Sequence, residues 1–351
     1  MDSVAALLSG SGAVASAIKI AVMIGVVMTA VAYITLAERK IAGFIQERYG
    51  PNRVGPWGLL QPLADGLKLM FKEEVIPTLA HRPTFILAPA ITFTTALAAW
   101  AVLPAGEPFS FFGQTIVPQI ADLDVGVLYV MAIASLGVYG IVLAGWSSNN
   151  KYSLMGGLRS SAQLISYELS MTLSLIGVLM AAGSLRLGDI VQAQTGSVWY
   201  IVAMPLGFFI FIVSAFAETN RAPFDLPEAE AEIVAGYHTE YSSMKFVMFY
   251  MSEYVSVTLS SCMMTLLFLG GWHLPFVEEM LRGLADPARF AVHALIFGAK
   301  ASCLVFLYIW VRWTLPRFRY DQLMHLGWKV LLPMALVNIL YVGGAILLGW
   351  F

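Results

Sequence analysis

The feature that most constrains this chain is a series of long apolar runs. A run of about 20 apolar residues is long enough to cross the hydrocarbon core of a bilayer as a helix. Eight such runs hold about half of the 351 residues: 16–37, 84–104, 126–147, 163–183, 199–219, 247–271, 290–312 and 328–350. A backbone in hydrocarbon has to satisfy its own hydrogen bonds, and these runs are too long for barrel strands. Each run therefore predicts a transmembrane helix.

Composition agrees with this interpretation. Only 12% of the residues are charged and the mean hydropathy is +0.76, whereas a soluble domain is about 25% charged. The formal net charge of −2 provides no basic surface, so nucleic acid is not an expected partner. The sequence predicts an all-α fold, with one membrane domain over residues 1–351 that is surrounded by lipid.

The distribution of lysine and arginine predicts the orientation. Thirteen of these residues lie in four loops, which are 38–83, 148–162, 220–246 and 313–327. Only three, Arg186, Arg282 and Arg289, lie on the other side. By the positive-inside rule, the four loops face the cytoplasm and both termini lie outside.

The first of these loops has a distinctive pattern. Two Gly-Pro pairs, 50–51 and 55–56, predict turns. Apolar residues then recur at helical spacing: Leu59, Leu60, Leu63, Leu67, Met70 and Phe71. They predict a short amphipathic helix at the membrane interface. It serves either as a surface anchor or as a doorway for an amphiphile that leaves the bilayer. Asp65 and Lys68, three residues apart, fit a surface ion pair equally well.

The loop 220–246 is acidic instead. Its carboxylates are Asp225, Glu228, Glu230, Glu232 and Glu240. Asp225 and Glu228 fit a helix-start pattern, with a cap followed three residues later by an acid. A structural cap explains these two residues but not five carboxylates in sixteen residues beside a membrane.

A few ionisable residues fall within the predicted membrane helices. Glu168, Glu253 and Lys300 lie inside them, and Glu218 lies at a cytoplasmic end. A charge at the bilayer centre costs at least about 2.5 kcal/mol, so such residues usually face protein or water and carry function. Helical rise places Glu168 and Glu253 about 8–9 Å deep. The three carboxylates are expected to line one polar chamber with Lys300 as their partner of opposite charge. The alternative is that they are snorkelling or hydrogen-bonded structural groups.

Resident redox centres are not expected on this chain. A membrane b-type haem needs paired histidines inside helices, and only His293 lies in one. Two cysteines are too few for a four-thiolate iron–sulfur site. The sequence also contains no Gly-rich phosphate loop.

Three stretches, 38–71, 218–241 and 312–329, resemble the H-subunit family of bacterial NADH:quinone oxidoreductases. The mitochondrial counterpart is the membrane subunit 1 of respiratory complex I. The resemblance implies a multi-pass protein in the bacterial cytoplasmic (inner) membrane. Such a protein contributes to a quinone tunnel beside the peripheral subunits and couples quinone reduction to proton translocation. FMN and iron–sulfur clusters are then held by partner subunits, with quinone as the substrate.

The resemblance also implies roles for residues that match its motifs. Those implied to border the quinone path are Arg53, Asp65, Lys68, Arg221 and Asp225. Those implied in proton coupling are Glu168, Glu218, Glu228, Glu230, Glu232, Glu253 and Lys300.

Two other functions fit parts of the sequence. In the first, the chain is the homologous membrane component of an energy-converting hydrogenase or formate-linked complex. In the second, it is a stand-alone secondary transporter that uses Glu168, Glu253 and Lys300. The glutamate run 228–232 and the complete first loop favour the quinone-linked function. Transporters often show internal inverted repeats, and none is detected here.

Overall fold

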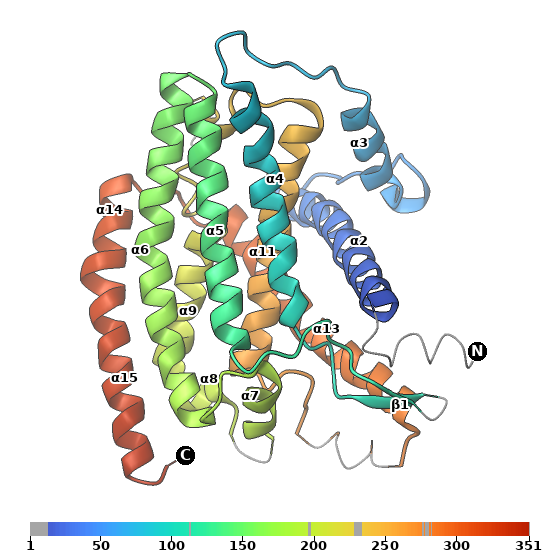
Figure 1. Ribbon diagram of the computed structural model, residues 1–351, viewed down its shortest axis with the longest axis vertical. Helices are drawn as coiled ribbons and strands as arrows, with labels where there is room; N and C mark the ends of the chain where they lie inside the picture. Colours follow the sequence, from blue (N-terminus) through green and yellow to red (C-terminus); the bar gives the residue numbers. More distant parts are fainter. Residues whose placement is uncertain are drawn as a thin grey trace.

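The computed structural model describes residues 13–350, except 112–113, 196–197, 228–233, 276, 278–280 and 282. The long helices are α2 (Ala13–Ile45), α4 (Arg82–Ala98), α5 (Gly126–Ser147), α6 (Lys151–Ala182), α9 (Pro205–Glu218), α11 (Ser243–Phe268), α13 (Asp286–Thr314) and α15 (Leu332–Leu347). They form a bundle in which α4, α5, α6 and α15 lie along the longest axis of the molecule and α2 is inclined to it (Figure 1).

Short elements connect the long helices. They are η1 (Pro56–Gly58), α3 (Gln61–Met70), η2 (Ala99–Val102), β1 (Phe109–Phe111), β2 (Gln114–Ile116), α7 (Leu187–Ala193), α8 (Tyr200–Ala203), η3 (Gly236–His238), α14 (Tyr320–His325) and the π-helical turn η4 (Leu326–Leu331). The two strands pair antiparallel, with Phe109 opposite Ile116. Apart from this small hairpin, the regular structure in the described residues is helical, as the sequence predicts.

Among the described residues, six helical segments are long and apolar enough to cross a membrane, which makes the chain a multi-pass membrane protein. They are Ser16–Ile45, Arg82–Val102, Gly126–Ser147, Lys151–Ala182, Asp286–Thr314 and Tyr320–Leu347. The predicted span 199–219 is divided, because Pro205 cannot donate a backbone hydrogen bond and begins a new helix after α8. The resulting helix α9 has only 14 residues. Helix α11 has 26 residues but interrupts its apolar sequence with Glu253 and several hydroxyl residues.

Several helices continue beyond the apolar runs. Helix α2 extends to Ile45, so Glu38 lies within it rather than at the start of a loop. Helix α6 begins at Lys151, twelve residues before the predicted span at 163. The Asn150 side chain caps it by accepting a hydrogen bond from the Tyr152 N–H at 2.9 Å. Hydropathy marks the part of a helix that faces lipid, whereas the helix itself continues into the polar layer.

The bundle packs most closely around α6, which contacts α5, α9 and α15. Small residues allow this packing. A Cβ on Gly145 of α5 would lie 2.6 Å from the Ser153 carbonyl oxygen of α6. Close approach of backbones at small residues is a common way to join helices in a membrane, where lipid tails compete for apolar contacts.

The connecting segments gather at two opposite ends of the bundle, the α3 end and the hairpin end (Figure 1). At the α3 end, the His81 N–H donates to the Ser147 carbonyl at 3.0 Å, and Asn150 donates to Glu240 at 2.6 Å. At the hairpin end, Arg289 forms an ion pair with Glu107 at 2.7 Å. The predicted cytoplasmic loops 38–83, 148–162 and 220–246 therefore meet at the same end.

Candidate functional site

A buried ion cluster lies toward the α3 end, centred on Arg221 in the segment that follows α9. Its guanidinium lies 3.7 Å from a carboxylate oxygen of Glu38 on α2 and 3.8 Å from one of Glu253 on α11. It also lies 4.0 Å from the centre of the Tyr254 ring. The three charged side chains are only 7%, 8% and 10% exposed, respectively. The cluster joins α2, the segment after α9 and α11.

Further groups satisfy the two carboxylates. The Tyr254 hydroxyl donates to Glu38 at 2.7 Å, and Arg312 of α13 forms an ion pair with the other oxygen of Glu38. The Tyr237 hydroxyl donates to Glu253 at 3.2 Å. Two cations thus face two anions, which limits the cost of burying charge.

The surroundings of Arg221 stabilise its positively charged form. Burial opposes the charged form, but Tyr254, Glu253 and Glu38 outweigh it and raise the pKa of the Arg221 guanidinium. The guanidinium therefore remains a fixed positive charge, while its carboxylate partners are groups that can take up a proton.

The backbone after α9 explains how Arg221 reaches this position. Asn220 adopts a left-handed conformation (φ 51°), which asparagine tolerates better than most residues. The buried Gln163 amide of α6 then donates to the carbonyls of Ala217 and Phe224 at 2.8 and 2.9 Å. One side chain of α6 thereby fixes both sides of the turn that carries Arg221.

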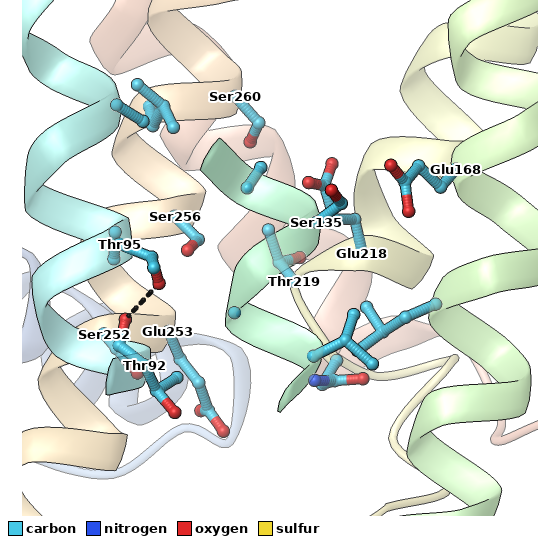
Figure 2. A pocket seen from close by; sticks show the side chains of 18 of the residues that line it. Thr92, Thr95, Ser135, Glu168, Glu218, Thr219, Ser252, Glu253, Ser256 and Ser260 are labelled. Atoms are coloured by element: carbon cyan, nitrogen blue, oxygen red, sulfur yellow. Dashed lines mark hydrogen bonds between the residues drawn. The ribbon is translucent and has the colours of Figure 1, made fainter. Parts of the chain in front are cut away.

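A cavity of about 90 Å³, whose mainly apolar lining includes carboxylate and hydroxyl groups, adjoins this cluster among α4, α5, α6, α9 and α11. Figure 2 shows Glu168, Glu218 and Glu253 in its lining. Hydroxyl groups complete the polar part of the lining: Thr92, Thr95, Ser135, Thr219, Ser252, Ser256 and Ser260. A cavity of this size that contains such polar groups is large enough for several water molecules. The structure thus brings together the three membrane carboxylates for which one chamber is predicted.

Glu253 belongs to both the cavity and the ion cluster. One of its oxygens faces Arg221, and its side chain also lines the cavity. On the far side, the side chains of Glu218 and Glu168 line the same cavity (Figure 2). Glu253 therefore links the ion cluster to the cavity that Glu218 and Glu168 also line.

The residues predicted at the quinone doorway lie apart from the ion cluster and the cavity. Arg53 is exposed in the turn before η1. Asp65 pairs with Arg39 of α2 at 2.5 Å and accepts from Gln61 at 2.9 Å. The suggested surface pair of Asp65 with Lys68 is therefore wrong, because α3 packs beside α2 and presents its carboxylate to that helix.

Asp225 also has a different setting from the predicted doorway. Its carboxylate accepts from Arg317 at 2.7 Å. Nearby, the Phe318 N–H donates to the Pro223 carbonyl at 3.1 Å. Asp225 therefore ties the segment after α9 to the connection between α13 and α14. The structure places the five predicted quinone-path residues in several separate environments.

Lys300 does not pair with the carboxylates, so that expectation is wrong. Its ammonium group donates to the carbonyls of Leu269, Gly271 and His273 at 2.7, 2.9 and 2.6 Å. It also lies 4.4 Å from the centre of the Trp199 ring. The carbonyls at a helix C-terminus carry partial negative charge and attract cations. Leu269 follows Glu253 by 16 residues, which is about 24 Å of helix.

The remaining predicted coupling residues, Glu228, Glu230 and Glu232, lie outside the described residues. Within the part of the chain that the structure describes, no group of three or more histidine, cysteine or acidic residues could hold a metal ion.

Glu38 and Arg312 belong to the site but are not predicted from the sequence. Both lie at the boundary of an apolar run, where a charge is unremarkable. Arg312 does carry one sequence signal. It is one of four lysines and arginines that lie within or at the ends of the predicted helices rather than in loops, and a cation there needs a partner inside the bundle.

Comparison with known proteins identifies the family. Residues 18–343 match the family described as NADH dehydrogenase. The chain belongs to the NADH dehydrogenase family. It is 52% identical to an H subunit of the NADH-quinone oxidoreductase of Cytophaga hutchinsonii, over 90% of this chain and 92% of that protein. It is also 52% identical to the corresponding H subunits of Geobacter metallireducens (94% and 96% covered) and Magnetococcus marinus (93% and 90%). The resemblance inferred from the three sequence stretches is confirmed.

Proposed function

We propose that this chain is the H subunit of a proton-pumping NADH:quinone oxidoreductase of the bacterial cytoplasmic membrane. It helps to enclose the quinone and passes the energy of quinone reduction toward proton translocation. The family and the names of the relatives support this role. FMN and iron–sulfur clusters belong to partner subunits, and this chain supplies ionisable groups and the cavity that they line.

The proposed topology has eight spans, with α9 and α11 crossing in addition to the six long apolar segments. The α3 end then faces the cytoplasm and both termini lie outside, which is supported by the excess of basic residues in loops that meet at that end. A single cysteine at position 53 (Arg53→Cys) in a Cys303→Ser background tests this topology. We expect a membrane-impermeant thiol reagent to modify it in inverted vesicles but not in intact cells, and the reverse pattern would contradict the topology.

The proposed quinone doorway is the region around α3. The side chains of Leu63, Leu67, Met70 and Phe71 are 55–86% exposed. An exposed amphipathic helix beside α2 is suited to the membrane surface, where an amphiphile such as quinone leaves the bilayer. Arg53, Asp65 and Lys68 lie on or near this helix, and we assign them to the doorway.

The observation that carries the proposed coupling is the double position of Glu253. Because it contacts Arg221 and lines the cavity, a change of charge near the ion cluster alters the field that Glu253 experiences. A proton held or released by Glu253 can move through water and hydroxyl groups in the cavity to Glu218 and Glu168. Glu228, Glu230 and Glu232 are proposed to lie on the approach to this path.

The transporter alternative is less well supported. It required Lys300 to act with Glu168 and Glu253, but the ammonium group of Lys300 is bound by backbone carbonyls.

Glu218→Gln in the assembled complex tests the coupling proposal. We expect a strong loss of both quinone reduction and proton pumping, because the amide retains shape but cannot exchange the proton. NADH:ferricyanide activity should be unchanged, since it bypasses the membrane site. Glu240→Gln, which lies at the same end and contacts Asn150 rather than the cavity, is the matched control. Normal turnover and pumping by assembled Glu218→Gln would reduce the carboxylate to a packing element.

A further inference from the structure

Helices α6, α9 and α15 meet along a buried seam that contains polar side chains. The seam is formed by Ser170 and Ser174 of α6, Ser214 of α9 and Asn338 of α15, all of them 0% exposed. Within the described part of the chain, the hydroxyls of Ser170 and Ser214 and both amide atoms of Asn338 have no hydrogen-bonding partner. Burying such groups costs free energy unless a ligand satisfies them.

Asn338 occupies a site that two glycines make possible. A Cβ on Gly177 of α6 would lie 3.2 Å from the Asn338 amide nitrogen, and one on Gly207 of α9 would lie 3.1 Å from it. The amide is therefore held where three helices meet. Apolar residues alone could join these helices, so packing does not explain an amide at this point.

The seam begins at the acidic cavity. On α9, Ser214 and Gly207 precede Glu218 by 4 and 11 residues, so all three lie on one helical face. Helical rise places Ser214 about 6 Å and Gly207 about 16 Å from Glu218 along the axis. On α6, Ser170 and Ser174 precede Gly177 at the same helical spacing. Polar groups thus extend stepwise from Glu218 to the level of Asn338.

The seam leads toward an open hollow on the surface of the molecule near the hairpin end. Tyr341, one turn after Asn338, donates to the Ala203 carbonyl at 3.4 Å. It also lines this hollow of about 480 Å³, together with Ala181, Tyr200 and Trp350. Asn338 therefore lies between the acidic cavity and the hollow at the opposite end. Met204 and Val342 pack beside Asn338 at the position that a Cβ on Gly177 would approach.

We propose that the seam binds a file of water molecules and forms a proton-release path from Glu218 to the hairpin-end hollow, gated at Asn338. This inference rests on the proposed coupling function. A proton leaves the Glu218 carboxyl, each water or serine hydroxyl accepts one proton and donates another, and one proton is released into water at the far end. Glu218 is reprotonated from the Glu253 side of the cavity, and no electron is transferred. The Asn338 amide orients water where the three helices meet.

Asn338→Leu in the assembled complex, reconstituted in proteoliposomes, tests the path. Leucine branches at Cγ as asparagine does but cannot bind water. We expect proton pumping and quinone reduction to slow together, because a Glu218 that cannot release its proton stalls both, while NADH:ferricyanide activity is unchanged. Asn338→Ser, which restores a hydroxyl, should recover part of the pumping. Val337→Leu, on the exposed side of the same helix, should behave as wild type.

Wild-type pumping by assembled Asn338→Leu would overturn the release path. If Glu218→Gln abolishes coupling while Asn338→Leu pumps normally, only the path fails; if Glu218→Gln is silent, the coupling function fails as well. If Asn338→Leu does not assemble, the release path is tested with Ser214→Ala and with a high-resolution density map of the wild-type complex. We expect ordered water beside the Asn338 amide and reduced pumping by Ser214→Ala, and the absence of both would overturn the proposal.

Discussion

Arg221 and Lys300 are two cations in the helical bundle with very different partners. Arg221, toward the α3 end, faces the carboxylates of Glu38 and Glu253 and the ring of Tyr254. Lys300, beyond the far end of α11, faces three backbone carbonyls and the ring of Trp199. Both cations lie over an aromatic ring, but only Arg221 has partners that can change their charge.

This difference indicates which cation can respond to chemistry. Carboxylates gain or lose protons when a charge nearby changes, whereas backbone carbonyls do not. The Arg221 cluster is therefore suited to transmit a signal, and Lys300 is suited to fix the end of α11. The sequence alone places Arg221 in a loop and Lys300 inside a membrane helix, and it does not show which partners either cation has.

The largest expected effect comes from Arg221→Met. Removing the guanidinium leaves Glu38 and Glu253 buried with less compensation, and breaking a buried pair in this way costs about 3–5 kcal/mol. We expect little assembled complex on native gels and little quinone reductase activity in membranes. Arg319→Met removes an exposed cation paired with Asp321 and should leave assembly close to wild type, because solvent screens such a pair. Wild-type assembly of Arg221→Met would show that the cluster contributes little.

Lys300→Met sharpens the comparison. The three carbonyls lose their donor, and leaving buried acceptors unpaired costs about 1–3 kcal/mol. We expect a lower melting temperature of the complex with unchanged quinone turnover per bound flavin. Lys300→Arg, which keeps donors and can lie over Trp199, should be closer to wild type. If Lys300→Met instead lowers quinone turnover without changing the melting temperature, Lys300 takes part in proton transfer.

The smallest effect on stability is expected for Asp65→Ala. Its pair with Arg39 is partly exposed and contributes about 0–1 kcal/mol. If quinone passes α3, the KM for quinone should rise several-fold while NADH:ferricyanide activity is unchanged. Lys72→Ala, an exposed change just beyond α3, is the control. Unaltered quinone kinetics in Asp65→Ala would show that Asp65 has no role at the quinone doorway beyond its ion pair with Arg39.

Whether a charged residue could be assigned to the site from sequence depends on where it lies relative to the apolar runs. Glu168, Glu218 and Glu253 could be placed in one chamber because a charge in hydrocarbon is costly and must find polar surroundings. Glu38 could not, because it follows an apolar run and reads as the first residue of a loop. Only the continuation of α2 to Ile45 brings it into the bundle.

The same limit explains the error at Lys300. A charge in a sequence is naturally paired with an opposite charge, but backbone carbonyls at a helix end carry no sequence signature of their own. The division of the span 199–219 was more accessible, since Pro205 is visible in the sequence. The neutral Asn338 could not be singled out in the same way, because burying an amide costs less than burying a charge and gives a weaker signal.

Glu253→Gln in an assembled complex is the most direct test of the central claim that the ion cluster and the cavity act as one unit. The amide keeps the size of the side chain and can still accept from Tyr237, but it removes the charge that the two regions share. If they act as one unit, quinone reduction and proton pumping fall together by more than tenfold, which corresponds to about 1.4 kcal/mol or more in the rate-limiting barrier, while NADH:ferricyanide activity stays at the wild-type level. Normal quinone reduction and normal pumping in that variant would contradict the claim.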